Sequence, residues 1–268
     1  MRKRVSLCLA VVGVLLLPGN FGPSTVGQEL EVPAGLVGWW RFAEAGGSLA
    51  ADSSGQGNGG TLVGSAFFDL DPMLGSALEV REASGGVKIP HDSSLEPPTG
   101  TIEAWVKVDS RQDSDVVVKV TRLMVRTNWS GWFAVYGLHL LKNGAVEGFV
   151  ANDDPAVWGH WTYARSRTGL YKLHQWHHLA LRWDGSTVAV FLDGQLRVAT
   201  PYLPVPGTGL SYYGSTDFEL AEGTVWGRHR ITEHDFIGRL GDVRFYIRPL
   251  SDEEIYRDYS LFDQAASR

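Results

Sequence analysis

The chain has 268 residues, of which 44% are hydrophobic, and it contains 10 Trp, 9 Tyr and 11 Phe. This apolar content is enough to bury a sizeable core without obligatory disulfides or structural metals. The formal net charge of -6 at pH 7 excludes a nucleic-acid-binding surface as the main feature, because such surfaces cluster Lys and Arg against phosphates.

The N-terminus has the pattern of a secretory signal peptide. Basic residues 2–4 precede an apolar run from Val5 to Leu17, which is shorter than the ~20 residues that span a bilayer. We predict a signal peptide over residues 1–27, with an uncleaved N-terminal anchor as the alternative, and a short leader over 28–35. A signal peptide predicts export to the periplasm, the cell exterior or the medium. The chain's one cysteine, Cys8, lies in the signal, so the mature chain would have no disulfide.

From residue 36 the pattern predicts β-strands. Apolar and polar residues alternate with a period of two in segments separated by turn-forming residues. Two Asp-Gly pairs, at 184–185 and 193–194, predict tight turns of an antiparallel meander. The predicted strands are 36–42, 101–108, 116–120, 138–141, 146–150, 177–183, 187–192, 218–220 and 240–247.

The C-terminus carries the main helix signal. Ser251 fits an N-cap, and Glu254 three residues later completes a capping box, so a short helix is expected before the tail at 263–268. The sequence therefore predicts an all-β protein, a two-sheet antiparallel jelly-roll sandwich with a short C-terminal helix, in one domain over residues 36–262.

Several segments together resemble the LamG-like jelly-roll domains of the concanavalin A-like lectin/glucanase superfamily. They are Gly35–Glu44, Asp52–Leu62, Gly75–Leu78, Val87–Pro90, Thr101–Val106, Gln175–Ala180, Leu192–Gly194, Phe236–Tyr246 and Arg248–Ser251. The resemblance implies two sheets with a curved face that, in relatives, binds glycans or protein partners, often with Ca²⁺. It fixes the fold far better than the function.

The loop that begins at Asp52 is the best metal candidate. It offers side-chain oxygens at residues 52, 54, 56 and 58, and hard cations such as Ca²⁺ take six to eight oxygen ligands. We name Asp52 and Asn58 as candidate ligands, and the family layout adds Glu44 and Asp242. Where relatives carry two adjacent acids, Gly241 occupies the first place, which removes one possible ligand. The alternative is a tight turn capped by Asx hydrogen bonds.

An aromatic segment with no family pattern, residues 128–173, supplies the candidate ligand-binding residues. Aromatic faces stack on the apolar faces of sugar rings, and neighbouring carboxylates and guanidinium groups bind hydroxyls; the same mixture suits protein interfaces. Burial of some of these aromatic residues in the core is the alternative. The candidates are Trp129, Trp132, Asp153, Asp154, Trp158, Trp161, Tyr163 and Arg165.

The chain has no recognisable catalytic motif. Glycoside hydrolysis on this fold needs two carboxylates flanking the bond, and Glu219 and Glu222, three residues apart, would face opposite ways on a strand. His177 and His178 would also point to opposite faces, so we expect them to be structural. The mature chain would lack a cysteine nucleophile.

We therefore predict a secreted, non-catalytic binding domain for a carbohydrate or an extracellular protein partner, with Ca²⁺ as a candidate cofactor. One alternative is a divergent glycoside hydrolase or lyase on the same fold. Another is a structural or adhesion module of the cell exterior.

Overall fold

The structure is a computed structural model that describes residues 32–82, 85–110, 114–126, 129–154, 157–202, 215–221, 225–226, 229–230 and 236–266. The description below concerns the unit that begins at Pro33. The predicted signal peptide, at residues 1–27, lies outside the described residues.

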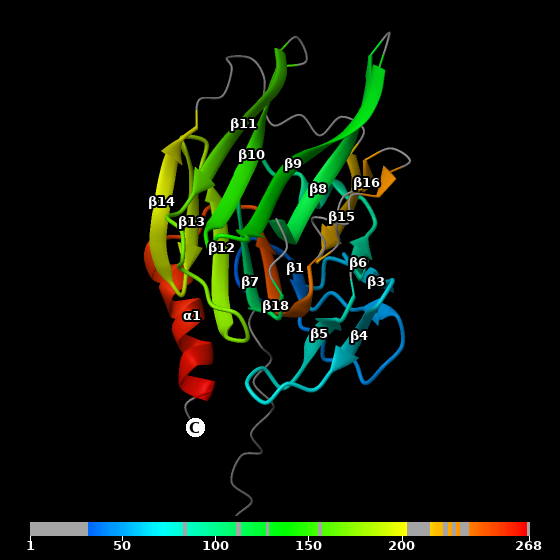
Figure 1. The fold of residues 1–268 in the computed structure, drawn as a ribbon, viewed down its shortest axis with the longest axis vertical. Helices are drawn as coiled ribbons and strands as arrows, with labels where there is room; N and C mark the ends of the chain where they lie inside the picture. The colour runs from blue at the N-terminus through cyan, green and yellow to red at the C-terminus, as the bar shows by residue number, and fades with distance from the viewer. Residues whose placement is uncertain are drawn as a thin grey trace, which may run out of the picture. The chain divides into compact units, whose positions relative to one another are not determined.

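Two antiparallel sheets make up the body of this unit (Figure 1). In the first sheet the strand order is β14-β13-β12-β7-β18-β5-β4, and β1 pairs with β18. Its strands are β1 (Leu36–Trp40), β4 (Ala66–Asp69), β5 (Ala77–Val80), β7 (Gly100–Val108), β12 (Trp176–Trp183), β13 (Thr187–Leu192), β14 (Gln195–Pro201) and β18 (Gly238–Tyr246).

The second sheet has the order β11-β10-β9-β8-β15-β6-β3-β2. Its strands are β2 (Leu49–Ala50), β3 (Gly60–Val63), β6 (Gly86–Ile89), β8 (Ser114–Arg126), β9 (Trp129–Leu141), β10 (Val146–Asp154), β11 (Val157–Arg165) and β15 (Ser215–Leu220). A small ribbon of β16 (Val225–Trp226) and β17 (His229–Arg230) and a 3₁₀ turn, η1 (Ser93–Leu95), complete the non-helical elements.

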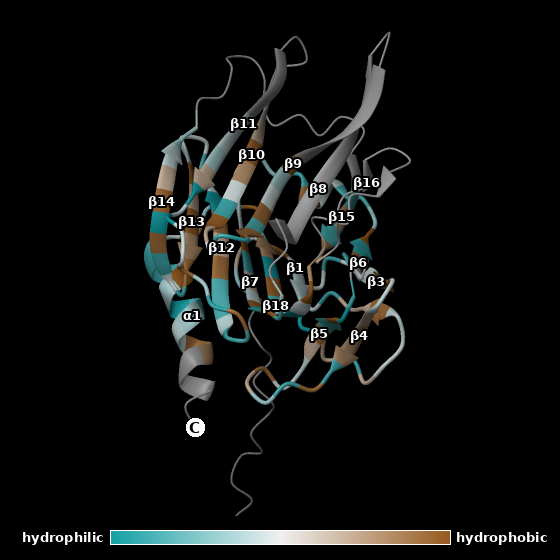
Figure 2. Cartoon of the chain, in the orientation of Figure 1, coloured by the Kyte–Doolittle hydropathy of each residue, from teal (hydrophilic) through white to brown (hydrophobic). Residues whose placement is uncertain are grey.

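The core lies between the sheets and is joined by stacked aromatic rings. Trp40 stacks on Phe218 with ring centroids 5.3 Å apart, Tyr136 on Trp183 at 5.3 Å, and Phe218 on Phe245 at 5.6 Å. Each pair takes one ring from each sheet, as expected where the inner faces of a sandwich interdigitate. In Figure 2, strand β12 carries a hydrophobic stretch, Leu179–Leu181, between the hydrophilic pair His177–His178 and Arg182.

The predicted fold class is confirmed, an all-β sandwich with a C-terminal helix. The Asp193-Gly194 turn is a two-residue hairpin loop, and both residues have positive φ, 53° and 69°, which a type I′ turn requires. At Asp184 the loop is longer, because the carboxylate accepts hydrogen bonds from the backbone N–H groups of Ser186 and Thr187. Strands β9 and β10 are longer than the strands predicted at 138–141 and 146–150, and β11 was not predicted.

The helix α1 (Asp252–Ala266) begins with the predicted capping box and extends into the segment expected to be a tail. The Ser251 N–H donates to Glu254 Oε2 at 2.8 Å, and the Glu254 N–H donates to Ser251 Oγ at 3.2 Å. The helix covers part of the outer face of the first sheet, where Ile255 packs with Ala180 and Phe191 in a second apolar cluster. No described helix is long and apolar enough to cross a membrane.

Beneath α1, the first sheet buries ionisable groups. Arg244 pairs with Asp242 at 2.8 Å and with Asp258 of the helix at 3.2 Å. Glu103 lies beside this group, fully buried, with Oε1 3.6 Å from Nε2 of His178. Burial, followed by the nearby charge of Asp258, raises the pKa of Glu103 well above its ordinary value. Burial lowers the pKa of His178 to about 3.

These two groups give stability an expected pH dependence. The raised pKa of Glu103 makes its contribution largest below 4.5, the ordinary value, and that contribution is lost as pH rises toward the folded pKa. For His178 the contribution is present above 6.5 and is lost as pH falls toward about 3. The two contributions change with pH in opposite directions above 4.5, because the pKa of Glu103 is raised and that of His178 is lowered.

We therefore expect the difference in unfolding free energy between the wild type and Glu103→Gln to shrink by up to about 1.4 kcal/mol per pH unit as pH rises above 4.5. Urea unfolding of the wild type and the variant at a series of pH values measures it. Parallel curves for the two proteins would contradict the neutral, buried Glu103.

Candidate functional site

The Asp52 carboxylate organises the turn that follows it. Oδ1 accepts from the backbone N–H groups of Trp39 at 2.9 Å and Ser54 at 2.8 Å. Oδ2 accepts from Ser54 Oγ at 2.8 Å and from the Asn58 N–H at 2.9 Å. These four bonds match the roughly four lone-pair sites of a carboxylate, so the turn itself uses the acceptor capacity of Asp52.

Asn58 connects the same loop to the core. Its side-chain Nδ2 donates to the Val37 carbonyl at 2.7 Å and to Ser94 Oγ at 3.0 Å, and its backbone carbonyl accepts from Trp40 Nε1 at 2.8 Å. The side chain is buried. Asn58 therefore holds the loop against β1 and η1.

The other two predicted ligands are engaged elsewhere. Glu44 Oε1 accepts from the Ala51 N–H at 2.6 Å, and its Oε2 is buried without a hydrogen-bond partner. Asp242 Oδ1 accepts from Trp39 Nε1 at 2.6 Å, and its Oδ2 pairs with Arg244. Within the described part of the chain, no three His, Cys, Asp or Glu side chains are grouped so that they could hold a metal ion. The arrangement of these residues does not fit Ca²⁺, which needs six to eight converging oxygens.

Gly241, where relatives carry an acid, has a packing explanation. A Cβ atom at this position would lie 2.4 Å from Leu74 Cδ1. The loop that carries Leu74 is held by Asp71, whose buried carboxylate accepts from the Met73 and Leu74 N–H groups and pairs with Arg239 at 3.1 Å. A side chain at position 241 would therefore have to displace the Leu74 side chain.

The predicted ligand-binding residues fall on three neighbouring strands of the second sheet: Trp129 and Trp132 on β9, Asp153 and Asp154 on β10, and Trp158, Trp161, Tyr163 and Arg165 on β11. The side chains of the first four and of Trp158 lie outside those that the structure describes. The remaining three, at positions 161, 163 and 165, share one face of β11 by strand alternation.

That face is the outer one, away from the core. Ala164 of β11 and Val150 of β10 point inward and are buried in the main core cluster. Tyr163 is 46% exposed, and Trp161 is partly exposed. The sheet thus presents two large aromatic side chains of its terminal strand on its outer surface, and we call Trp161, Tyr163 and Arg165 the β11 row.

Side chains of β10 and β9 support the β11 row. The Tyr163 ring lies 5.6 Å from that of Phe149, which lies 5.1 Å from His139 edge-on. Nε and Nη2 of Arg165 each lie 2.5 Å from Oε2 of the buried Glu147. Burial, and then the charge of Glu147, raises the pKa of Tyr163, so its hydroxyl is neutral at pH 7.

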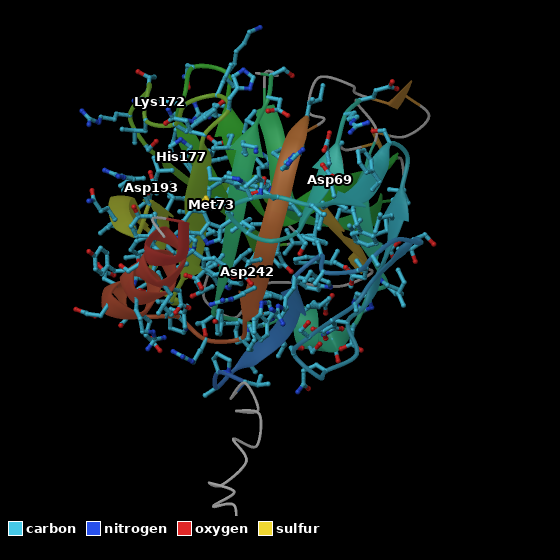
Figure 3. All side chains as sticks on the ribbon, turned by 90° about the horizontal axis from the view of Figure 1, so that it is seen from below. Asp69, Met73, Lys172, His177, Asp193 and Asp242 are labelled. Carbon is cyan, nitrogen blue, oxygen red and sulfur yellow. The ribbon has the colours of Figure 1, made fainter. Side chains whose placement is uncertain are left out.

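The two adjacent histidines lie on opposite faces of β12, as alternation predicts. His177 Nδ1 lies 3.0 Å from Asp193 Oδ2, and its Nε2 accepts from the Lys172 N–H at 3.1 Å (Figure 3). His178 packs against Trp105 with ring centroids 5.3 Å apart. Both ring nitrogens of His177 therefore hold the fold.

The sequence did not predict one pair of neighbouring acids. Asp217 and Glu219 of β15 are two residues apart, so they share the outer face of the second sheet, opposite the buried Phe218. Only Glu219 and Glu222 were compared in the sequence. The spacing of Asp217 and Glu219 would have placed both acids on one face if the predicted strand had included both residues.

The role of the Asp52 carboxylate in the turn can be tested by substitution. Asp52→Ala leaves the buried donors of Ser54 and Asn58 without their acceptor, at an expected cost of about 2–3 kcal/mol in unfolding free energy. We expect Ca²⁺ to leave the melting temperature of the wild type unchanged, because a ligand that binds only the native state must raise it.

Thermal unfolding of both proteins, in Ca²⁺ and in EDTA, measures both effects, with Glu253→Ala on the exposed surface of α1 as the control. A wild-type melting temperature that rises with Ca²⁺, and fails to rise in Asp52→Ala, would restore the metal site.

Comparisons with known proteins agree with this geometry. A family model described as the concanavalin A-like lectin/glucanases superfamily matches residues 81–256. None of the curated proteins compared with the chain matches it.

Solved structures with a similar fold include three carbohydrate- or receptor-related proteins. The Trypanosoma rangeli sialidase in complex with sialic acid is matched at TM-score 0.63 and 20% identity, over 88% of this chain and 35% of the sialidase. Domain 4 of AbnA, a GH43 extracellular arabinanase from Geobacillus stearothermophilus, in complex with arabinotriose, is matched at TM-score 0.57 and 17% identity. The match covers 83% of this chain and 97% of the arabinanase domain. The receptor binding domain of botulinum neurotoxin C/D mosaic serotype is matched at TM-score 0.60 and 10% identity, over 84% of this chain and 51% of the neurotoxin chain.

At these identities the solved structures show the fold alone, and the chain spans about a third of the sialidase. The family model is the stronger finding, because it matches well over half of the chain. This protein belongs to the concanavalin A-like lectin/glucanase superfamily.

Proposed function

We propose that this protein is an exported, non-catalytic carbohydrate-binding domain whose ligand rests on the outer face of the second sheet, at the β11 row. The observation that carries the proposal is the exposed ring of Tyr163 beside Trp161 and the fixed guanidinium of Arg165. Exposed aromatic rings on a rigid sheet provide apolar stacking surface at low entropic cost, and Arg165 keeps N–H donors for hydroxyls.

Two of the structural neighbours are compatible with this proposal. One is a sialidase that was solved with sialic acid, and another is an arabinanase domain that was solved with arabinotriose. The proposed recognition does not include calcium, because Asp52, Asn58, Glu44 and Asp242 each make hydrogen bonds or ion pairs that hold the fold. Export rests on the signal-peptide pattern at residues 1–27.

Replacing the stacking residues should weaken binding without unfolding the protein. We expect Trp161→Ala and Tyr163→Ala each to lower affinity for a bound glycan about tenfold, which corresponds to ~1.4 kcal/mol. The melting temperature should change little for Tyr163→Ala, because a partly exposed surface ring contributes little to stability.

A glycan array, followed by titration calorimetry with the best glycan, measures the effect. Tyr256→Ala, which removes a similarly exposed ring from helix α1 over the first sheet, is the matched control. Unchanged retention by both β11 variants would remove the site, and binding of an extracellular protein with no glycan retained would favour the adhesion alternative.

Asp217 and Glu219 keep a glycoside hydrolase as a second candidate. Residues two apart on a strand are ~6.6–6.8 Å apart, and hydrolases use carboxyl separations of ~5–5.5 Å for retention and ~6.5–9.5 Å for inversion. Against this, Lys119 of β8 and Lys88 of β6 directly flank Glu219 in the register, as in a structural ladder of alternating charge.

The binding proposal predicts that the wild-type protein releases no reducing ends from the glycans it retains. A reducing-sugar assay with long incubation measures this, with Glu219→Gln and Asp217→Asn beside the wild type. Release by the wild type that both variants lose would establish the hydrolase instead.

A further inference from the structure

We infer that the β11 row takes an extended, linear and electrically neutral oligosaccharide that runs along strand β11. This inference rests on the proposed function and specifies the class of glycan and its direction on the sheet.

The direction follows from which side chains are accessible. Along β11, Tyr163 and Arg165 are exposed and Trp161 is partly exposed. Across the strands, the β10 neighbours that face the same way and whose side chains the structure describes are buried: Phe149 is 5% exposed, and Glu147 and Ala151 are also buried. Among these described side chains, a ligand therefore finds ring surface along β11 and little on β10.

The spacing favours several sugar rings over one. Alternate residues on a strand are ~6.6–6.8 Å apart, so the β11 row extends over ~13 Å. The rings of Trp161 and Tyr163 and the guanidinium of Arg165 therefore present three contacts in sequence. A monosaccharide reaches one of them, whereas a linear chain parallel to the strand reaches all three.

The charge balance favours a neutral chain. Arg165 is the cation of the row, and both Nε and Nη2 contact the buried carboxylate of Glu147. The pair is neutral as a unit, and the whole chain carries a net charge of -6. A guanidinium that is already neutralised still offers three N–H donors to hydroxyl oxygens, but it offers little net attraction to a carboxylate or sulfate.

The support of the row also fits a fixed geometry. Gly137 of β9 lies under the Phe149 ring, where a Cβ atom would come within 2.6 Å of Phe149 Cε1. Phe149 in turn packs against Tyr163. This packing holds the Tyr163 ring in place before a ligand arrives, which reduces the ordering cost of binding.

The inference can be tested by calorimetric titration of the full chain with two series of glycans. One series is neutral and linear, from monosaccharide to hexasaccharide, and the other is an acidic uronate series. The neutral sugar type is the one retained on the array. We expect affinity to rise at least tenfold from the monosaccharide to the trisaccharide or tetrasaccharide and then to level off, with the uronates at least tenfold weaker at equal length. A monosaccharide that binds as tightly as the hexasaccharide would overturn the extended-chain inference while the proposed function stands.

Two variants sharpen the test. Tyr163→Ala should remove most of the gain with length and leave the monosaccharide affinity within about twofold, whereas Tyr256→Ala should keep the gain. Glu147→Gln frees the charge of Arg165, so we expect uronate affinity to rise several-fold relative to the neutral series. A wild-type preference for uronates, or a Glu147→Gln variant with unchanged selectivity, would overturn the neutral-ligand part. Binding of no glycan of any kind would instead refute the proposed function.

Discussion

The fold depends on aromatic stacking across the interior of the sandwich. Tyr136 and Phe218 of the second sheet contact Trp183 and Phe245 of the first, with ring centroids 5.3–5.8 Å apart. Because side chains alternate with a period of two, a register slip by one residue would turn these rings outward. The same register turns Tyr163 toward solvent. The core therefore determines which aromatic residues remain available to a ligand.

Local signals in the sequence predicted the elements that depend on neighbouring residues. Ser251 and Glu254 form their capping box, and Asp193 with Gly194 forms the hairpin turn. The segment up to Arg165 was harder, because an aromatic-rich run has no polar alternation that separates its two faces. Its strands pair with their neighbours as successive hairpins, as where Trp161 lies opposite Ala151.

The candidate site shows the same limit. An Asp-rich glycine loop offers the same oxygens to a cation and to backbone N–H groups, so composition left both interpretations of Asp52 open. Only the positions of Trp39 and Asn58 show that the donors of the fold occupy this carboxylate. The pair Asp217 and Glu219 depended on a strand boundary, since the predicted strand began one residue after Asp217.

The two outer faces of the sandwich differ in what their polar groups do. On the first sheet, α1 covers Glu103 and His178, and Arg244 is committed to Asp242 and Asp258. A ligand there would have to displace a helix and expose a charge network. On the second sheet, Arg165 meets a single carboxylate, and Tyr163 keeps nearly half of its surface in water. A ligand at the β11 row would not have to displace a helix or open such a charge network, and this difference supports our proposal that the ligand rests on this face.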